Sequence, residues 1–289
     1  MELEATRPEG AEVHFETPSP TGGHPPSVVR CEPESGSVFP IGDTTARCTA
    51  TDAAAATVTC ELLITVRGLP RTLSRTRFMA FGDSITDGAT TLAPLVMLDV
   101  ADTYPFKLEQ MLLQGYPTQT FVVSNQGKNG ETAAEGARRL PPLLDSEKPE
   151  VLLLLEGVNA VWLLSTSSQA DSIRRMIVSA RQRDVEVILA TLMPVSAEYD
   201  ARRSPSLSRI RALNARIVDL AAEYRLGPVV DLYSLFEANM HLLGADGLHP
   251  TLEGQTRIAE AFRDEIVRRY EARATMTSGF LTMRATNGR

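Results

Sequence analysis

Continuous apolar runs of strand length recur along the chain from residue 77 onward, and helical stretches separate them. Five runs fit this description: Phe78–Phe81, Phe121–Ser124, Val151–Leu155, Val185–Ala190 and Val229–Leu232. Unbroken apolar runs indicate strands that are buried on both faces, as in a parallel sheet. Because strands and helices alternate in regular order, we predict an α/β domain with a five-stranded parallel sheet flanked by helices. Ligands are expected at the carboxyl ends of the strands.

Residues 1–67 have a different texture. Short runs rich in valine, threonine and isoleucine, among them Ser27–Cys31, Thr44–Thr51 and Thr57–Val66, are separated by turn residues. Several short strands at this spacing predict a small all-β sandwich. We therefore divide the chain into a β domain at 1–67, a linker at 68–76, an α/β domain at 77–270 and a tail at 271–289.

All three cysteines, Cys31, Cys48 and Cys60, fall in the β domain. Clustered cysteines in a small β domain favour an oxidising compartment, where a disulfide would support a small core. Three buried free thiols are the alternative. We therefore expect a secreted or periplasmic protein, although the first residues show neither a basic nor an apolar signal segment. A processed protein would look the same.

The bulk composition excludes several classes of function. A formal net charge of −7 argues against a general nucleic-acid binder, because phosphate contacts require a basic face. No apolar run approaches the roughly eighteen residues that a membrane-spanning helix needs. No Cys-x-x-Cys pair or histidine cluster indicates a metal site, so we expect neither a metal nor a cofactor.

Two motifs contain candidate catalytic residues. Phe81–Gly88 follows the first α/β strand and would place Ser84 at its carboxyl end, where a base can reach the hydroxyl and the serine amide can face an oxyanion. Gly244–Pro250 precedes the last helix and puts His249 three residues after Asp246. That spacing lets the carboxylate fix the tautomer of the imidazole while the other ring nitrogen faces a serine. Taken singly, each motif could be an ordinary turn.

Two further blocks follow the second and third strands of the α/β domain. Asn125–Thr132 contains glycines whose amides can approach a ligand closely, and Glu156–Ala160 contains Asn159, whose side chain can donate to an oxyanion. Each block alone could be a loop of turn residues. All four together, in this order along the chain, are far more specific than any one.

In order and content the four blocks resemble the SGNH hydrolase family in its GDSL-like branch, over roughly residues 77–270. The resemblance implies a flavodoxin-like fold and a serine esterase. It assigns Ser84 as nucleophile, Asp246 and His249 as the rest of a catalytic triad, and Ser84, Gly130 and Asn159 as donors of an oxyanion hole. There is one departure, because the third block of the family commonly reads Gly-x-Asn-Asp and here Ala160 takes the last place.

The N-terminal segment resembles a hyalin-repeat (HYR) module. The resemblance rests on Cys31–Thr45, on Cys48–Asp52 and on the run that ends at Val66. It implies an immunoglobulin-like fold, an extracellular setting and a Cys31–Cys48 disulfide, which leaves Cys60 without a partner. The segment departs from the family at Ala53–Ala56, where a glycine is usual.

The substrate pocket is less constrained than the catalytic residues. Its candidates are Asp83, Leu95, Val158, Ala160, Trp162 and Met193. The apolar stretch around Leu95 could line a pocket or pack in the core, and Trp162 could wall the site or be buried. We expect a small-molecule or glycan ester as substrate, and the absence of a long apolar lid favours short acyl chains. The alternatives are a carbohydrate O-deacetylase or thioesterase on the same site, and an adhesion or carbohydrate-binding protein with an inactive α/β domain.

Overall fold

A computed structural model describes residues 1–7, 9–68, 71–90 and 96–273. The chain divides into two compact units. Unit 1 comprises Met1–Thr72 with Ala272–Arg289, and unit 2 comprises Leu73–Glu271. The division after Thr72 falls inside the predicted linker, whereas most of the predicted tail lies outside the described residues.

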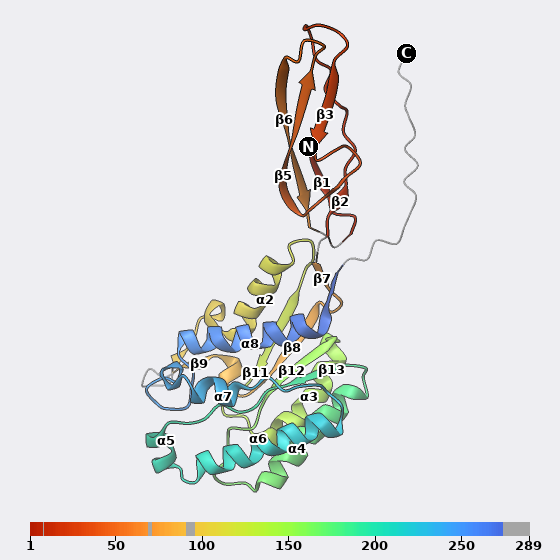
Figure 1. Ribbon diagram of the computed structural model, residues 1–289. Helices are drawn as coiled ribbons and strands as arrows, with labels where there is room; N and C mark the ends of the chain where they lie inside the picture. Colours follow the sequence, from red (N-terminus) through yellow and green to blue (C-terminus); the bar gives the residue numbers. More distant parts are fainter. Residues whose placement is uncertain (8, 69–70, 91–95, 274–289) are drawn as a thin grey trace. The chain divides into compact units, whose positions relative to one another are not determined.

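The sheet of unit 2 consists of four parallel strands (Figure 1). Their order is β11 (Val122–Gly127), β8 (Arg77–Gly82), β12 (Val151–Leu155) and β13 (Glu186–Leu189). All five side chains of β12 are buried, as its unbroken apolar run indicates. The second strand, β11, is added on one side of β8 and the third, β12, on the other side. The order of the strands thus reverses at β8, and a crevice forms there at the carboxyl ends of the strands.

The prediction of a fifth strand at Val229–Leu232 was wrong. Val230 forms a single parallel bridge with Ala190, through hydrogen bonds of 2.8 and 3.0 Å made by its amide and carbonyl. The next residue, Asp231, is already the N-cap of α7 (Leu232–Glu237), and its carboxylate accepts an amide of that helix. Because the helix begins so soon after the bridge, too little chain remains to extend a ladder.

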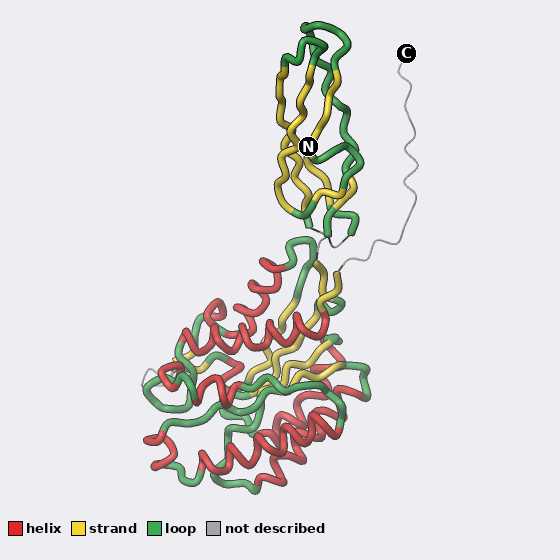
Figure 2. The backbone as a smooth tube through the Cα atoms, in the orientation of Figure 1, coloured by secondary structure: helices red, strands yellow, loops and turns green. Residues whose placement is uncertain are grey.

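Helices cover both faces of the sheet (Figures 1 and 2). One face carries α2 (Tyr104–Gly115) and α8 (Leu252–Tyr270), and the other carries α3 (Ala133–Glu147), α4 (Thr166–Arg181) and α6 (Ser206–Glu223). The shorter elements are α1 (Ser84–Asp87), α5 (Ala197–Arg202), the 3-10 helices η1 (Val100–Asp102) and η2 (Met240–Leu242), and the ribbons β9 (Ala89–Thr90) with β10 (Val96–Met97) and β7 (Arg71–Leu73) with β14 (Glu271–Arg273). Every helix among the described residues is too short or too polar to span a bilayer.

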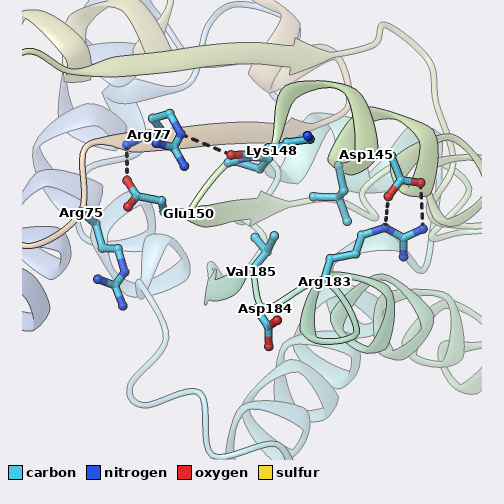
Figure 3. A pocket seen from close by; sticks show the side chains of 10 residues that line it. Arg75, Arg77, Asp145, Lys148, Glu150, Arg183, Asp184 and Val185 are labelled. Atoms are coloured by element: carbon cyan, nitrogen blue, oxygen red, sulfur yellow. Dashed lines mark hydrogen bonds and ion pairs between the residues drawn. The ribbon is translucent and has the colours of Figure 1, made fainter.

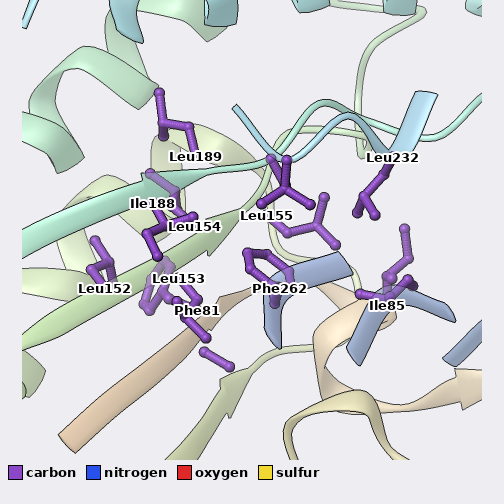
Figure 4. Packing of buried hydrophobic residues seen from close by; sticks show 14 of the residues in the cluster. Phe81, Ile85, Leu152, Leu153, Leu154, Leu155, Ile188, Leu189, Leu232 and Phe262 are labelled. Carbon is purple, nitrogen blue, oxygen red and sulfur yellow. The ribbon is translucent and has the colours of Figure 1, made fainter. Parts of the chain in front are cut away.

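The core of unit 2 lies between the sheet and its two helical layers. Figure 4 shows the leucines of β12 packed with Phe81 of β8 and Phe262 of α8. Burying each large apolar side chain stabilises the fold by roughly 1.5–3 kcal/mol. The strand ends are therefore fixed, and the loops that follow them start from rigid positions.

Unit 1 contains strands and no helix among its described residues. A mixed four-stranded sheet has the order β1 (Glu2–Glu4), β6 (Thr57–Arg67), β5 (Gly42–Thr51) and β3 (Val28–Glu32), and β2 (Ala11–Glu12) pairs with β4 (Val38–Phe39). Its small core includes Val13, Phe39 and Ile64. The resemblance of this unit to a hyalin-repeat module, with an immunoglobulin-like fold, stays a prediction.

The three cysteines lie in one row across three neighbouring strands. Cys48 of β5 is directly opposite Cys31 of β3 on one side and Cys60 of β6 on the other. Cys31 and Cys48 form the disulfide that the family resemblance implies, whereas Cys60 is a free, exposed thiol. A covalent link between β3 and β5 supports a unit whose apolar core is small.

Candidate active site

Ser84 lies at the turn that joins β8 to α1. Asp83 caps this short helix, and its carboxylate accepts a hydrogen bond of 3.0 Å from the Ile85 amide. A Cβ atom on Gly82 would lie 2.1 Å from the carbonyl oxygen of Leu155, so only glycine allows the ends of β8 and β12 to approach this closely. The serine is thereby held at the carboxyl edge of the sheet, next to the crevice.

His249 approaches Ser84 from the loop that precedes α8. Its Nε2 is 2.9 Å from Ser84 Oγ, and its Nδ1 is 2.6 Å from Asp246 Oδ2. The other carboxylate oxygen, Asp246 Oδ1, accepts the amides of Leu248 and His249 at 2.9 and 3.0 Å. Ser84 and His249 are only 2% and 6% exposed. A hydroxyl, an imidazole and an orienting carboxylate are therefore lined up in hydrogen-bonding order.

Asp246 is held in its ionised form. Its partial burial would raise the pKa of the carboxyl group, but hydrogen bonds from the His249 ring and from the loop amides outweigh burial and lower that pKa below its usual value. An ionised acceptor favours the tautomer of His249 that carries its proton on Nδ1. Nε2 is then free to accept the proton of the Ser84 hydroxyl.

The two other predicted oxyanion donors lie on loops that are bonded to each other. Gly130 follows β11 and has φ of +75°, in the left-handed region that favours glycine. Asn159 follows β12, and its Nδ2 donates to the carbonyl oxygen of Glu131 at 3.0 Å. A side-chain amide has two N–H groups, so the second N–H can serve a ligand.

Ala160 occupies a strained backbone position. Its φ of +64° lies in the left-handed region, which aspartate and asparagine tolerate better than alanine. The Ala160 carbonyl accepts the amides of Leu163 and Leu164, both at 2.9 Å, and so closes the turn that follows. The departure from the family pattern thus removes a carboxylate and keeps the turn.

Three carboxyl side chains are buried beneath the site. Asp83, Glu131 and Glu156 are 1%, 2% and 2% exposed. Burial raises the pKa of Asp83 to about 6, and burial together with repulsion from Asp83 and Glu131 raises the pKa of Glu156 well above its usual value. Neither carboxyl oxygen of Glu156 has a hydrogen-bond partner among the described residues, whereas Glu131 is paired with Arg139. Our sequence reasoning missed Glu131, Glu156 and Arg139, because the local sequence does not reveal which charged side chains point inward.

The predicted pocket residues lie in different surroundings. Val158 and Met193 are buried in the core of unit 2, and Asp83 is buried in the turn before Ser84. Ala160 and Trp162 are partly exposed, and the guanidinium of Arg203 lies 4.3 Å from the centre of a Trp162 ring. Leu95 lies outside the described residues. Asp83, Val158 and Met193 are therefore too buried to contact a substrate directly, whereas Ala160 and Trp162 have surface that a substrate can reach.

A cavity of about 500 Å³ opens at the opposite edge of the sheet, where β8, β12 and β13 begin (Figure 3). Its lining includes Arg77, Lys148, Glu150 and the ion pair of Arg183 with Asp145, whose two hydrogen bonds measure 2.7 and 3.0 Å. No residue of the candidate triad lines this cavity. Within the described residues, no group of three or more histidine, cysteine or carboxyl side chains is placed to hold a metal ion.

Comparison with known proteins supports the fold and the family resemblance. Residues 80–257 match the GDSL-like lipase/acylhydrolase family. Esterase TesA of Pseudomonas aeruginosa is 25% identical over 201 residues, which cover 69% of this chain and 89% of that protein. The lipase/acylhydrolase of Enterococcus faecalis has a TM-score of 0.59 at 25% identity and covers 68% of this chain and 97% of its own. A carbohydrate acetylesterase family member from Sinorhizobium meliloti has a TM-score of 0.55 at 19% identity, with 67% and 98% covered, and shows the shared fold alone.

The match to the family covers more than half of the chain and spans every described residue of the candidate site, from Ser84 to His249. The solved structures superimpose on about two thirds of the chain and share its α/β fold. The chain therefore belongs to the GDSL-like lipase/acylhydrolase family, whose members are carboxylic ester hydrolases.

Proposed function

We propose that the protein is a serine esterase for short-chain carboxylic esters, with Ser84, His249 and Asp246 as its catalytic triad. The observation that carries this proposal is the unbroken series of contacts through the imidazole. The His249 Nε2 lies 2.9 Å from Ser84 Oγ and its Nδ1 lies 2.6 Å from Asp246 Oδ2, and both distances support the proposed roles of nucleophile, base and orienting carboxylate.

The reaction is acyl transfer in two steps. Ser84 Oγ attacks the ester carbonyl while His249 Nε2 takes the hydroxyl proton, and Asp246 stabilises the imidazolium that forms. The oxyanion accepts hydrogen bonds from the amides of Ser84 and Gly130 and from the side chain of Asn159. His249 then gives its proton to the leaving alcohol oxygen, and a water molecule repeats the sequence on the acyl-enzyme to release the acid.

A preference for short acyl chains is supported by the packing around the site. Val158 and Met193, which could have lined a long acyl channel, are buried in the core. A long chain would have to displace these side chains from a close-packed interior, which costs free energy. An acetyl group is small enough to bind without displacing Val158 or Met193.

Removal of acetyl groups from a carbohydrate is a second candidate for the same site. The partly exposed ring of Trp162, three residues after Asn159, favours it, because aromatic side chains combine a flat apolar face with a polar edge and suit sugar rings. Solved structures named as acetylesterases, including an acetylxylan esterase from Geobacillus stearothermophilus at 18% identity and a TM-score of 0.55, share the fold.

Hydrolysis of a graded panel of esters by wild type and Ser84→Ala tests the proposal. The panel comprises p-nitrophenyl acetate, butyrate and octanoate, acetylated xylan and an acetyl thioester. Ser146→Ala, at an exposed serine of α3, is the matched control. We expect the wild type and the control to cleave the short esters, and Ser84→Ala to cleave essentially none. Full activity of Ser84→Ala would refute the assignment, and a wild type that cleaves no member of the panel would favour a binding protein.

A further inference from the structure

The buried ion pair between Glu131 and Arg139 lies directly behind the predicted oxyanion donors. We infer that these two residues are positioning residues, which hold Gly130 and Asn159 in place relative to Ser84. The inference rests on the proposed function, because an oxyanion hole matters only if Ser84 performs acyl transfer.

Glu131 is in contact with both donors through its backbone. It follows Gly130 directly, so a shift of Glu131 changes the backbone dihedral angles of Gly130, whose amide is the predicted donor. Its own carbonyl oxygen accepts the 3.0 Å hydrogen bond from Asn159 Nδ2. A shift of Glu131 would therefore displace a backbone donor and a side-chain donor together.

Both carboxylate oxygens of Glu131 accept hydrogen bonds from the guanidinium of Arg139. Arg139 Nε donates to Oε1 and Oε2 at 2.8 and 3.0 Å, and Nη2 donates to Oε2 at 2.5 Å. Nη2 also donates to the carbonyl oxygen of Gln126 in β11, at 2.9 Å. The guanidinium carbon lies 4.3 Å from the centre of the Phe81 ring in β8. Arg139 thus ties the Gly130 loop to the two strands whose ends frame it.

Helix α3 fixes the distance between the partners of this pair. Thr132 caps the helix, and its side chain and that of Glu135 form a reciprocal capping box with the backbone. The helix therefore begins at Ala133, two residues after Glu131, and Arg139 lies about two turns further on the face toward the sheet. The pair is preorganised by secondary structure and does not depend on a flexible approach of the two side chains.

A role in stability alone is a poor explanation for the pair. The Glu131 side chain is 1% exposed and the Arg139 side chain 22% exposed. The pair gains little net stability over apolar side chains, because Glu131 loses its hydration and Arg139 loses most of its own. The other charged groups that interact with Glu131 are the exposed Lys128, whose Nζ is 3.8 Å from Oε1, and the buried Glu156. Two hydrogen-bonding nitrogens of Arg139 hold both carboxylate oxygens of Glu131, so the pair fixes the orientation of Glu131 as well as its distance. The two donors depend on that fixed orientation.

The expected size of the effect follows from the donors that move. Removal of one oxyanion donor typically lowers the rate on the order of 10²–10³-fold, and a misplacement of about 1 Å can cost about 10²-fold. We therefore expect Glu131→Gln and Arg139→Lys to lower kcat about 10- to 100-fold. KM should change much less, because the donors act mainly in the transition state.

The experiment compares these two variants, Asn159→Ala and the double variant Glu131→Gln/Asn159→Ala with p-nitrophenyl acetate. Arg183→Gln is the matched control, because it breaks the bidentate pair with Asp145 at the far end of α3 (Figure 3). Thermal unfolding followed by tryptophan fluorescence verifies that each variant is folded. The double variant should lose less activity than the product of the two single losses, because Glu131 acts partly through Asn159.

The outcomes separate this inference from the proposed function. A folded Arg139→Lys with wild-type kcat would overturn it, and so would a loss of kcat in Arg183→Gln of the same size. Arg139→Lys keeps the charge and loses only the two-point contact, so this result is decisive even if Glu131→Gln does not fold. Ser84→Ala is measured in the same assay. If that variant stays active the esterase proposal fails, whereas an inactive Ser84→Ala beside fully active Glu131 and Arg139 variants removes only the positioning role.

Discussion

Replacing Glu156 with glutamine should change how the stability of unit 2 depends on pH. The Glu156 carboxyl is 2% exposed, has no hydrogen-bond partner among the described residues, and faces the carboxyls of Asp83 and Glu131. Burial and this repulsion raise its pKa well above 4.5. Over the pH range between these two pKa values, the folded protein therefore keeps a proton on Glu156 that the unfolded chain releases.

The direction and size of the effect follow from proton linkage. A group whose pKa is raised on folding contributes its full stability below its unfolded pKa, and that contribution is lost as pH rises toward the folded pKa. For Glu156 the unfolding free energy of the wild type falls by up to about 1.4 kcal/mol per pH unit, or at most about 3 kcal/mol between pH 5 and 7. Glu156→Gln lacks this dependence, and Asp83 contributes in both proteins. Relative to wild type, the variant should therefore gain stability steadily as pH rises.

Urea unfolding at pH 5, 6, 7 and 8 and constant ionic strength measures the difference. Trp162 is the only tryptophan, so its fluorescence reports the unfolding of unit 2 alone. A difference in unfolding free energy that is the same at every pH does not test the reasoning, whereas a difference that changes with pH does. Glu237→Gln makes the same chemical change at a side chain that is 53% exposed and paired with Arg211, which stays charged throughout this range, and should give no slope. Parallel pH profiles for wild type and Glu156→Gln would refute the reasoning.

Two other perturbations have clear expected results. Gly127→Ala should lower both the melting temperature and the rate of ester hydrolysis, because its Cβ would lie 2.0 Å from the backbone nitrogen of Asp87 in α1. Circular dichroism measures the melting temperature, and p-nitrophenyl acetate hydrolysis measures the rate. A wild-type melting curve for this variant would contradict the close approach of Gly127 to Asp87. Reduction of the Cys31–Cys48 disulfide, which spans 17 residues, should destabilise unit 1 by about 3 kcal/mol and leave ester hydrolysis unchanged. Activity lost on reduction would show that the catalytic residues of unit 2 do not suffice.

Of the strands predicted in the α/β domain, Val151–Leu155 is a strand and Val229–Leu232 is not, and the difference has a physical reason. The run Val151–Leu155 is buried on every side, so its composition alone predicts a central strand, and β12 has those bounds. Val229–Leu232 has the same apolar character but contains Asp231, whose carboxylate caps α7. A single capping hydrogen bond thus decided between strand and helix, and apolar content gives no sign of it.

The sequence alone determined which residues reach the carboxyl edge of the sheet and to which family the chain belongs. Blocks that follow parallel strands must meet at one edge, so Ser84 and Asn159 could be expected there from their order along the chain, whereas only the family resemblance singled out Gly130. Only the tertiary structure decided what lies behind them. Arg139 follows another arginine on its helix, and Glu156 follows an apolar run. Neither position shows that the side chain turns inward beside another charge. Burial and charge pairing depend on which elements pack together, and that information is spread over the whole chain.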